Sequence, residues 1–258
     1  MDSVKRWIWS ALAVVCGLAC LWLLYRAIPK GSEPVQTPVS TPVVPREQAA
    51  EAQPEPETPY ISPIDFAYWQ GECGDIYAWL AIPGTDISYP VVQHPTDDEY
   101  YLKRDIYGRS SADGALFTQA GYNDDGFGDA VTVIYGHRMN SGAMFGQLQP
   151  LYLGDVDFSG YNEFVVYLPD REEHYRIFAA VPHSNEHILY QYDFSDPERY
   201  RAFLDSVYDL TDSAANYDED AAAAVGDKLV ILSTCLKTNR TNRFLVIGKL
   251  VETVGKAS

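Results

Sequence analysis

Eight short β-like runs, each bounded by turn-forming residues, dominate the chain from residue 77 onward. They are rich in Val, Ile, Tyr and Phe, which favour strands, and most follow one another too closely for alternating strand–helix units. They predict a mainly β domain, a mostly antiparallel barrel or sandwich. The expected strands are 77–82, 87–93, 114–118, 129–135, 163–168, 174–181, 228–233 and 243–251.

Two helices are expected beside these strands. Residues 61–72 have a helical pattern, with Asp65 near its start. Later, the run Ser195-Asp196-Pro197-Glu198 matches a capping box, in which a serine begins a helix and a glutamate lies three residues on. Apolar residues follow at helical spacing: Tyr200, Phe203, Leu204, Val207 and Leu210. The sequence thus predicts a long helix inserted before the strand at 228–233.

The first 28 residues have a different character. Trp7–Tyr25 is a run of 19 residues with no charge and one polar side chain. A helix of this length crosses about 30 Å of hydrocarbon, and the run is long for a cleaved signal peptide. We therefore predict a cytoplasmic N-terminus at 1–6 and a transmembrane signal anchor at 7–28. Lipid attachment at Cys20 is the competing interpretation, but no leucine lies three residues before it.

Residues 29–59 form a proline-rich segment that contains eight of the 16 prolines. Such a composition buries too little apolar surface to fold, and proline stiffens it toward an extended polyproline helix. We predict an extracellular linker at 29–59 and a catalytic domain at 60–258.

Charge and cysteine spacing exclude some classes of function. The formal net charge of −17 disfavours nucleic acid as a partner, because phosphate binding needs a basic surface. The four cysteines, Cys16, Cys20, Cys73 and Cys235, include no CxxC pair. His183 and His187 have HxxxH spacing but lie in an expected loop, so no metal site is predicted. No cofactor is expected.

Cys235 is the candidate nucleophile. It ends the apolar strand KLVILSTC, residues 228–235, and a cysteine that leaves a buried strand is both held rigidly and partly exposed. A buried core cysteine is the ordinary alternative, and it is the interpretation we prefer for Cys73. A Cys73–Cys235 disulfide is a further, disfavoured alternative.

Two more strand ends supply partners for a thiol. His137 follows the strand VTVIYG, and imidazole is the usual partner of a cysteine nucleophile. Arg243 opens the last strand, where a guanidinium can stabilise an oxyanion if this strand forms a hairpin with the strand of Cys235. Arg240 is the rival arginine, in the loop between them.

Together, the cysteine, histidine and arginine segments resemble those of the sortases, and of class B sortases in particular. ILSTC resembles the TLxTC signature, IYGHRM resembles the histidine motif, and the arginine that opens the last strand completes the set. Class B features lie in the same order along the chain: WLAIPGTDISYPVVQH, Tyr101-Leu102, GALF, SGAMFGQL and the long helical insertion before the cysteine strand.

The resemblance implies an eight-stranded β-barrel with N-terminal helices and a transpeptidase activity without cofactor. It implies Cys235 as nucleophile, His137 as general acid and base, and Arg243 as the oxyanion group. It also implies substrate contacts from Leu102, Ser233 and Thr234. The expected partners are secreted proteins with an NPxTx-like C-terminal sorting signal and a peptidoglycan amine of a Gram-positive cell wall.

Three points stay open at this stage. The acceptor amine is either a peptidoglycan amine or the lysine of a pilin. A non-enzymatic surface module on a stalk would explain the anchor and linker equally well. The exact sorting motif is also undetermined, because Leu236-Lys237 follow the cysteine where class B members often carry acidic residues.

Overall fold

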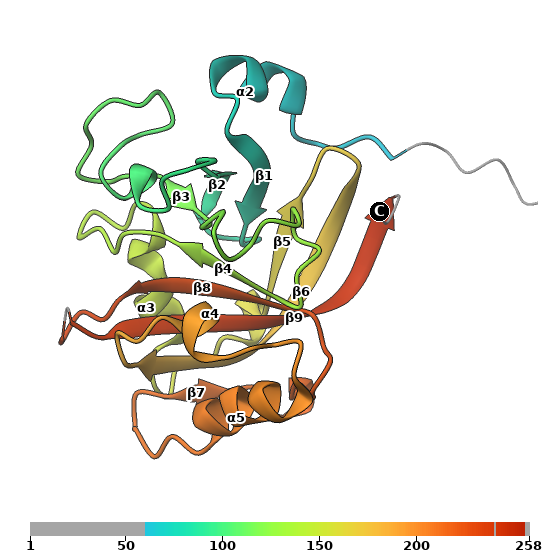
Figure 1. Ribbon diagram of the computed structural model, residues 1–258. Helices are drawn as coiled ribbons and strands as arrows, with labels where there is room; N and C mark the ends of the chain where they lie inside the picture. The colour runs from blue at the N-terminus through green and yellow to red at the C-terminus, as the bar shows by residue number, and fades with distance from the viewer. Residues whose placement is uncertain (1–59, 240, 256–258) are drawn as a thin grey trace, which may run out of the picture. The chain divides into compact units, whose positions relative to one another are not determined.

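The computed structural model describes residues 60–239 and 241–255, and the strands of these residues close into a barrel (Figure 1). In the described chain, eight strands are hydrogen-bonded in the order β1-β2-β3-β4-β8-β9-β6-β5, and β5 pairs with β1 to close the ring. The expectation of a mainly β, eight-stranded barrel is confirmed. The strands are β1 (Ile76–Ala81), β2 (Ser88–Val92), β3 (Leu116–Phe117), β4 (Val131–Tyr135), β5 (Glu163–Tyr167), β6 (Arg171–His183), β8 (Leu229–Cys235) and β9 (Arg243–Gly255).

Two strands are longer than their apolar patterns indicate. β6 begins at Arg171 rather than at residue 174, and β9 continues to Gly255 rather than ending at 251. The two strands pair with each other along almost their whole length, from Arg171 opposite Gly255 to His183 opposite Arg243. Backbone pairing therefore extends both strands through polar residues that a hydrophobic pattern does not identify. A ninth strand, β7 (Asn216–Tyr217), pairs with β6 outside the barrel and was not predicted.

The pairing of β4 with β8 is parallel, in a barrel that is otherwise mostly antiparallel. Tyr135 at the end of β4 lies opposite Ser233 near the end of β8. β9 is antiparallel to β8, so Arg243 at its start lies opposite Cys235. Three chain segments that are distant in sequence thus meet at one rim of the barrel.

The helices differ from expectation at their starts. α2 (Phe66–Glu72) begins five residues after Ile61, because Asp65 is its N-cap and accepts a hydrogen bond from the Tyr68 amide. α5 (Pro197–Tyr208) is capped by Asp196, so the prediction of Ser195 as the capping residue is wrong. The Ser195 hydroxyl instead donates to Asp193. Two shorter helices are α3 (Leu148–Tyr152) and α4 (Ile188–Gln191).

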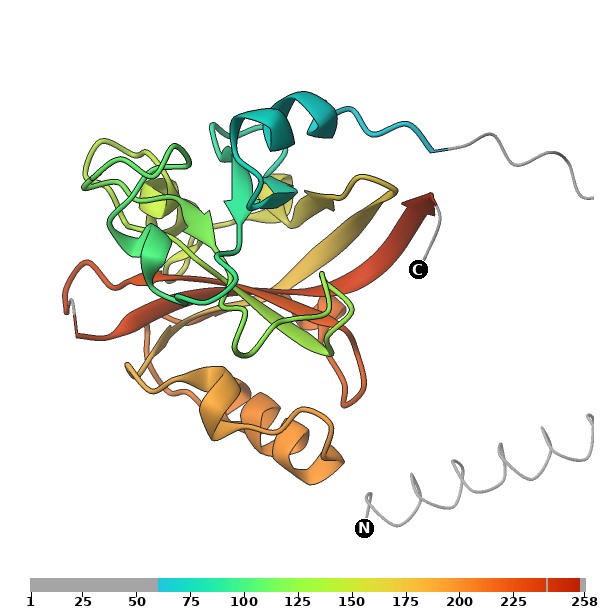
Figure 2. The same cartoon turned by 45° about the horizontal axis from the view of Figure 1, so that its top comes forward.

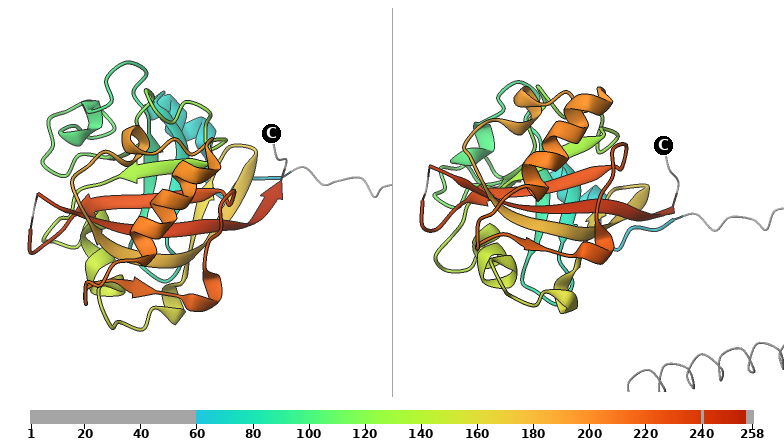
Figure 3. Two further views of the ribbon diagram at one scale, coloured as in Figure 1. Left: turned by 60° about the horizontal axis from the view of Figure 1, so that its bottom comes forward. Right: turned by 90° about the horizontal axis from the view of Figure 1, so that it is seen from below.

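Apolar side chains on β8 alternate between two clusters. Val230 and Leu232 belong to the cluster that includes Phe145 and Phe164, whereas Leu229 and Ile231 join Phe203 and other residues of α5. α5 lies across the outer face of β8 and β9 (Figure 2, Figure 3). The sheet is therefore covered on both faces, which explains the uninterrupted apolar sequence of β8.

The predicted anchor at 7–28, the predicted linker at 29–59 and the rival Arg240 lie outside the described residues. Over residues 60–239 and 241–255, no helix combines the length and the apolar character that crossing a membrane requires.

Candidate active site

His137 and Cys235 reach the same rim because β4 and β8 run in parallel. The amide of Gly136 donates to the carbonyl of Ser233 at 3.1 Å, which continues the ladder one residue beyond Tyr135. His137 then follows β4 at the level at which Cys235 ends β8. Ring and thiol are both half-buried, so both are held by the fold while remaining accessible.

Arg243 faces Cys235 across the β8–β9 hairpin. Its Nη1 donates to the Cys235 Sγ at 3.3 Å, and both side chains are half-buried. Cys235 and Cys73 are both free thiols, so the disulfide alternative is not seen. Cys73 is buried, and its Sγ lies 3.6 Å from the Tyr101 hydroxyl, in agreement with a packing role.

A pocket of about 240 Å³ gathers all six of the predicted site residues. A second pocket of the same volume is lined by His137 and Cys235 together with Arg138, Met139 and Asn140. The imidazole and the thiol thus border both pockets. The first pocket is lined by Leu102, Phe117, Tyr135, Gly136, His137, Ser233, Thr234, Cys235 and Arg243.

The three predicted substrate contacts differ in what they offer. Ser233 and Thr234 are buried, and the Thr234 hydroxyl has no hydrogen-bond partner among the described residues. Leu102 is half-buried, and its backbone carbonyl lies 2.6 Å from Nε2 of His137. This last contact joins a predicted substrate-contact residue to the imidazole.

Gln149 on α3 is a site residue that sequence reasoning missed. Its Nε2 donates to the Cys235 carbonyl at 2.9 Å, and its Oε1 accepts from the Lys237 amide at 2.9 Å. The carboxamide is buried. It forms with the backbone of Cys235 and Lys237 the two hydrogen bonds that a neighbouring strand would otherwise form. Its position directly after the SGAMFGQL run was the only available signal.

An aromatic wall extends from the first pocket. The rings of Phe117 and Tyr135 are stacked with centroids 5.4 Å apart, and Tyr135 lies 6.5 Å from the ring of His187. Burial raises the pKa of Tyr135, although the Arg243 charge opposes this effect. The phenol is therefore a neutral neighbour of the guanidinium at physiological pH.

His187 caps a helix rather than lying in a loop. Its Nδ1 accepts from the Tyr190 amide at the start of α4, and its Nε2 contacts Gln119 at 2.7 Å. Burial lowers the pKa of His187, which favours the neutral ring that this cap requires. In the described part of the chain, no cluster of His, Cys, Asp and Glu could hold a metal ion.

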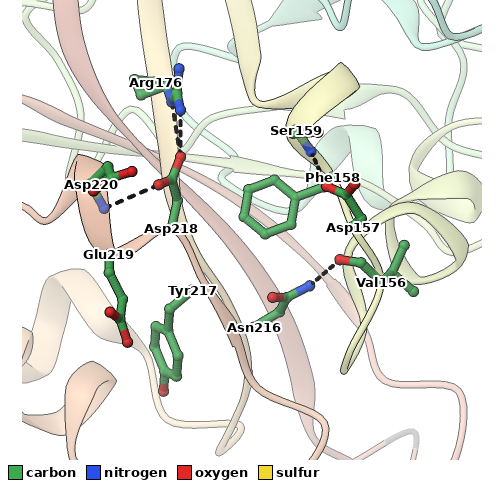
Figure 4. Close-up of a pocket in the computed structure, with 10 residues that line it drawn as sticks. All are labelled: Val156, Asp157, Phe158, Ser159, Arg176, Asn216, Tyr217, Asp218, Glu219 and Asp220. Atoms are coloured by element: carbon green, nitrogen blue, oxygen red, sulfur yellow. Dashed lines mark hydrogen bonds and ion pairs between the residues drawn. The ribbon is translucent and has the colours of Figure 1, made fainter.

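Another pocket, of about 380 Å³, lies between β6, β7 and the segment that precedes β5 (Figure 4). Its residues are joined to one another: Arg176 forms an ion pair with Asp218 at 2.6 Å, and Asn216 donates to the Val156 carbonyl. None of the six predicted site residues lines it. These contacts attach β7 to the barrel.

The comparisons with known proteins agree with this geometry. The family model described as a sortase domain matches residues 80–251. Sortase B of Listeria monocytogenes is 29% identical over 189 residues, which cover 69% of this chain and 70% of that protein.

Solved structures show the same likeness. Sortase B of Bacillus anthracis, in a complex with AAEK1, superposes with a TM-score of 0.61 and 28% identity, over 72% of this chain and 84% of that one. A Streptococcus pyogenes class B sortase involved in pilus biogenesis gives a TM-score of 0.59 and 25% identity, over 73% and 98%.

Proposed function

The chain belongs to the sortase family of cysteine transpeptidases, and on that premise we propose that it cleaves a C-terminal sorting signal after threonine and joins the released protein to an amine. The observation that carries the proposal is the convergence of Cys235, His137 and Arg243 on one pocket. A binding module on a stalk would not need a thiol, an imidazole and a guanidinium at one rim.

In the first half of the proposed reaction, the Cys235 thiolate attacks the threonyl carbonyl and a C–S bond forms, with His137 as imidazolium. Arg243 stabilises the oxyanion, a role that its donation to the thiol at 3.3 Å supports. His137 gives a proton to the leaving nitrogen as the C–N bond breaks. The product is a thioester, which keeps the acyl group reactive without ATP or a metal ion.

In the second half, an amine attacks the thioester and a new C–N bond forms. The C–S bond breaks and releases the Cys235 thiolate, while His137 accepts the proton of the amine. The first candidate acceptor is a peptidoglycan amine, which would attach a surface protein to the cell wall. A pilin lysine is the second candidate, because one similar class B sortase is described as involved in pilus biogenesis. Both acceptors supply the same nucleophile, and the sequence that surrounds the amine distinguishes them.

The proposed location follows from the N-terminal sequence. The segment 7–28, which contains the apolar run, would anchor the chain in the cell membrane, with the catalytic domain outside and the linker at 29–59 as a spacer. Secreted substrates and wall precursors would meet the enzyme on that side.

The test uses the full-length protein in detergent and a library of NPxTx-type peptides. Hydroxylamine attacks thioesters, so wild type should release a peptide hydroxamate that mass spectrometry detects. Cys235→Ala should give none, and Cys73→Ala, which lacks only a packing cysteine, should behave as wild type. If wild type gives no hydroxamate with any sorting-signal peptide, the proposal is wrong. Competition between a wall stem peptide and a lysine-bearing pilin peptide then identifies the acceptor.

A further inference from the structure

The Leu102 carbonyl determines which ring nitrogen of His137 carries the proton. Nε2 lies 2.6 Å from the Leu102 carbonyl, and a carbonyl oxygen can only accept a hydrogen bond. Nε2 must therefore carry hydrogen. Among the described residues, Nδ1 has no hydrogen-bond partner, which leaves it free for another molecule.

The Leu102 carbonyl is itself held in place. Leu102 ends a short 3-10 helix, Tyr100–Leu102, in which Tyr101 is buried. The Tyr101 hydroxyl donates to Asp75 at 2.6 Å, and the Tyr101 carbonyl accepts from the Ala115 amide at 3.1 Å. The carbonyl that contacts the imidazole thus belongs to an anchored turn.

Gly114 makes room for this contact. It has φ of +61°, and a Cβ at this position would lie 2.7 Å from the Tyr101 carbonyl, 3.0 Å from the Leu102 carbonyl and 3.2 Å from Cδ2 of His137. Any larger residue would have to displace the carbonyl, the imidazole or both. The glycine is required by the geometry of the His137–Leu102 pair as well as by its own backbone.

We propose that the Leu102 carbonyl, packed against Gly114, is a positioning group that holds His137 as its Nε2–H tautomer and leaves Nδ1 to exchange protons with the reacting amines. The tautomer follows from geometry alone, and only the identity of the amines rests on the proposed function. Leu102 has a double role, because its side chain lines the substrate pocket while its carbonyl orients the imidazole.

The proton balance requires no change of tautomer. Imidazolium gives its Nδ1 proton to the leaving nitrogen as the C–N bond breaks and the thioester forms, and the neutral ring that remains carries hydrogen on Nε2. The incoming amine later returns a proton to Nδ1. The bond to the Leu102 carbonyl persists throughout the cycle.

The first test is direct and needs no activity. In full-length protein labelled with ¹⁵N-histidine, long-range ¹H–¹⁵N spectra distinguish the two neutral tautomers, and His137→Gln identifies the signals of His137. We expect the Nε2–H form in wild type. An Nδ1–H form in the folded wild type would overturn the proposal without any variant.

Variants test whether the Leu102 carbonyl and Gly114 fix the tautomer of His137. Gly114→Ala should shift the tautomer ratio and lower kcat by about 10²-fold, the cost of misplacing a catalytic group by about 1 Å, with little change in KM. Leu102→Ala keeps the carbonyl, so it should keep the tautomer and raise KM. Gly226→Ala is the control for backbone strain, because Gly226 has φ of +95° and its Cβ would meet nothing within 4 Å.

An unchanged His137 spectrum in folded Gly114→Ala would refute the positioning role. If Gly114→Ala does not fold, Tyr101→Phe replaces it. This variant frees the turn from Asp75, so it should broaden or shift the His137 signals, and unchanged signals would refute the role equally. An inactive wild type with the Nε2–H tautomer would reject the transpeptidase proposal and leave this one standing.

Discussion

Cys235 and Arg243 lie directly opposite each other in the β8–β9 ladder, and Nη1 of Arg243 donates to the Cys235 sulfur at 3.3 Å. The pair is cross-strand, so two backbones fix its geometry at once. The guanidinium can therefore act where negative charge develops without first being reorganised.

Arg243→Ala should slow formation of the acyl-enzyme by about 10²–10³-fold, the usual cost of removing an oxyanion donor. The rate for Arg243→Lys should fall between those of wild type and Arg243→Ala, because lysine keeps the charge and lacks the planar guanidinium. Rapid quench with mass spectrometry measures the single-turnover rate. Lys249→Ala, on the same strand but outside the pocket, is the control. An alanine variant as fast as wild type would exclude Arg243 from the chemistry.

Gln149→Met should lower the free energy of unfolding by about 1–3 kcal/mol, because it leaves the Cys235 carbonyl and the Lys237 amide without their partner. Urea denaturation measures the change. Gln147→Met is the matched control, since Gln147 makes one exposed hydrogen bond to Asp86 and should change stability by less than about 0.5 kcal/mol. Equal effects of the two substitutions would show that Gln149 does not support the nucleophile's backbone.

Glu173 is a buried carboxylate that contacts Arg171, Lys228 and Tyr175. Glu173→Leu should cost about 3–5 kcal/mol, because it leaves two cations without their buried partner. Thermal unfolding measures this loss. Glu219→Gln, at an exposed position, should be close to neutral. A neutral Glu173→Leu variant would mean that the cations find water instead.

The same carboxylate predicts an acid-sensitive stability. Burial alone would raise the pKa of Glu173, but hydrogen bonds from Tyr175, Arg171 and Lys228 outweigh burial and lower it. A lowered folded-state pKa gives stability that is complete above the unfolded value of 4.5 and is lost as pH falls toward the folded value. The Tm of wild type should fall more than that of Glu173→Gln between about pH 6 and about pH 3, a range that brackets the titration of an unfolded glutamate carboxyl. Parallel Tm curves for the two proteins would contradict the linkage.

His174 predicts the opposite dependence of stability on pH. Burial would lower the pKa of His174, but hydrogen bonds to Glu163 and Glu172 raise it. The stability that it adds is therefore complete below the unfolded value of 6.5 and is lost as pH rises through the folded value. The Tm advantage of wild type over His174→Gln should be larger at about pH 5.5 than at about pH 8.5. His183→Gln is the control, and an advantage that grows with pH would contradict the assignment.

Local pattern was enough to find the eight strands of the barrel and the candidate residues at their ends. The apolar run that ends in Cys235 and the glycine before His137 are features of neighbouring residues, so they can be read without knowing what lies beside them. The ends of β6 and β9 could not be read in this way, because polar residues such as Glu172 and Glu252 are strand residues only through each strand's pairing with the other. The cap of α5 was misplaced by one residue for a similar reason, since both Ser195 and Asp196 are good caps locally.

The sequence by itself determined which side chains can act and that each lies at the end of a β-strand. The tertiary structure alone decided that they lie together at one rim of the barrel. Parallel pairing of β4 with β8 brings His137 level with Cys235 although 98 positions separate them, and antiparallel pairing of β9 sets Arg243 opposite the thiol. The contacts of Gln149 with residue 235 and of Leu102 with His137 likewise join distant segments through the backbone. Backbone carbonyls and amides are the same at every position, so no sequence pattern marks the ones that a fold will use.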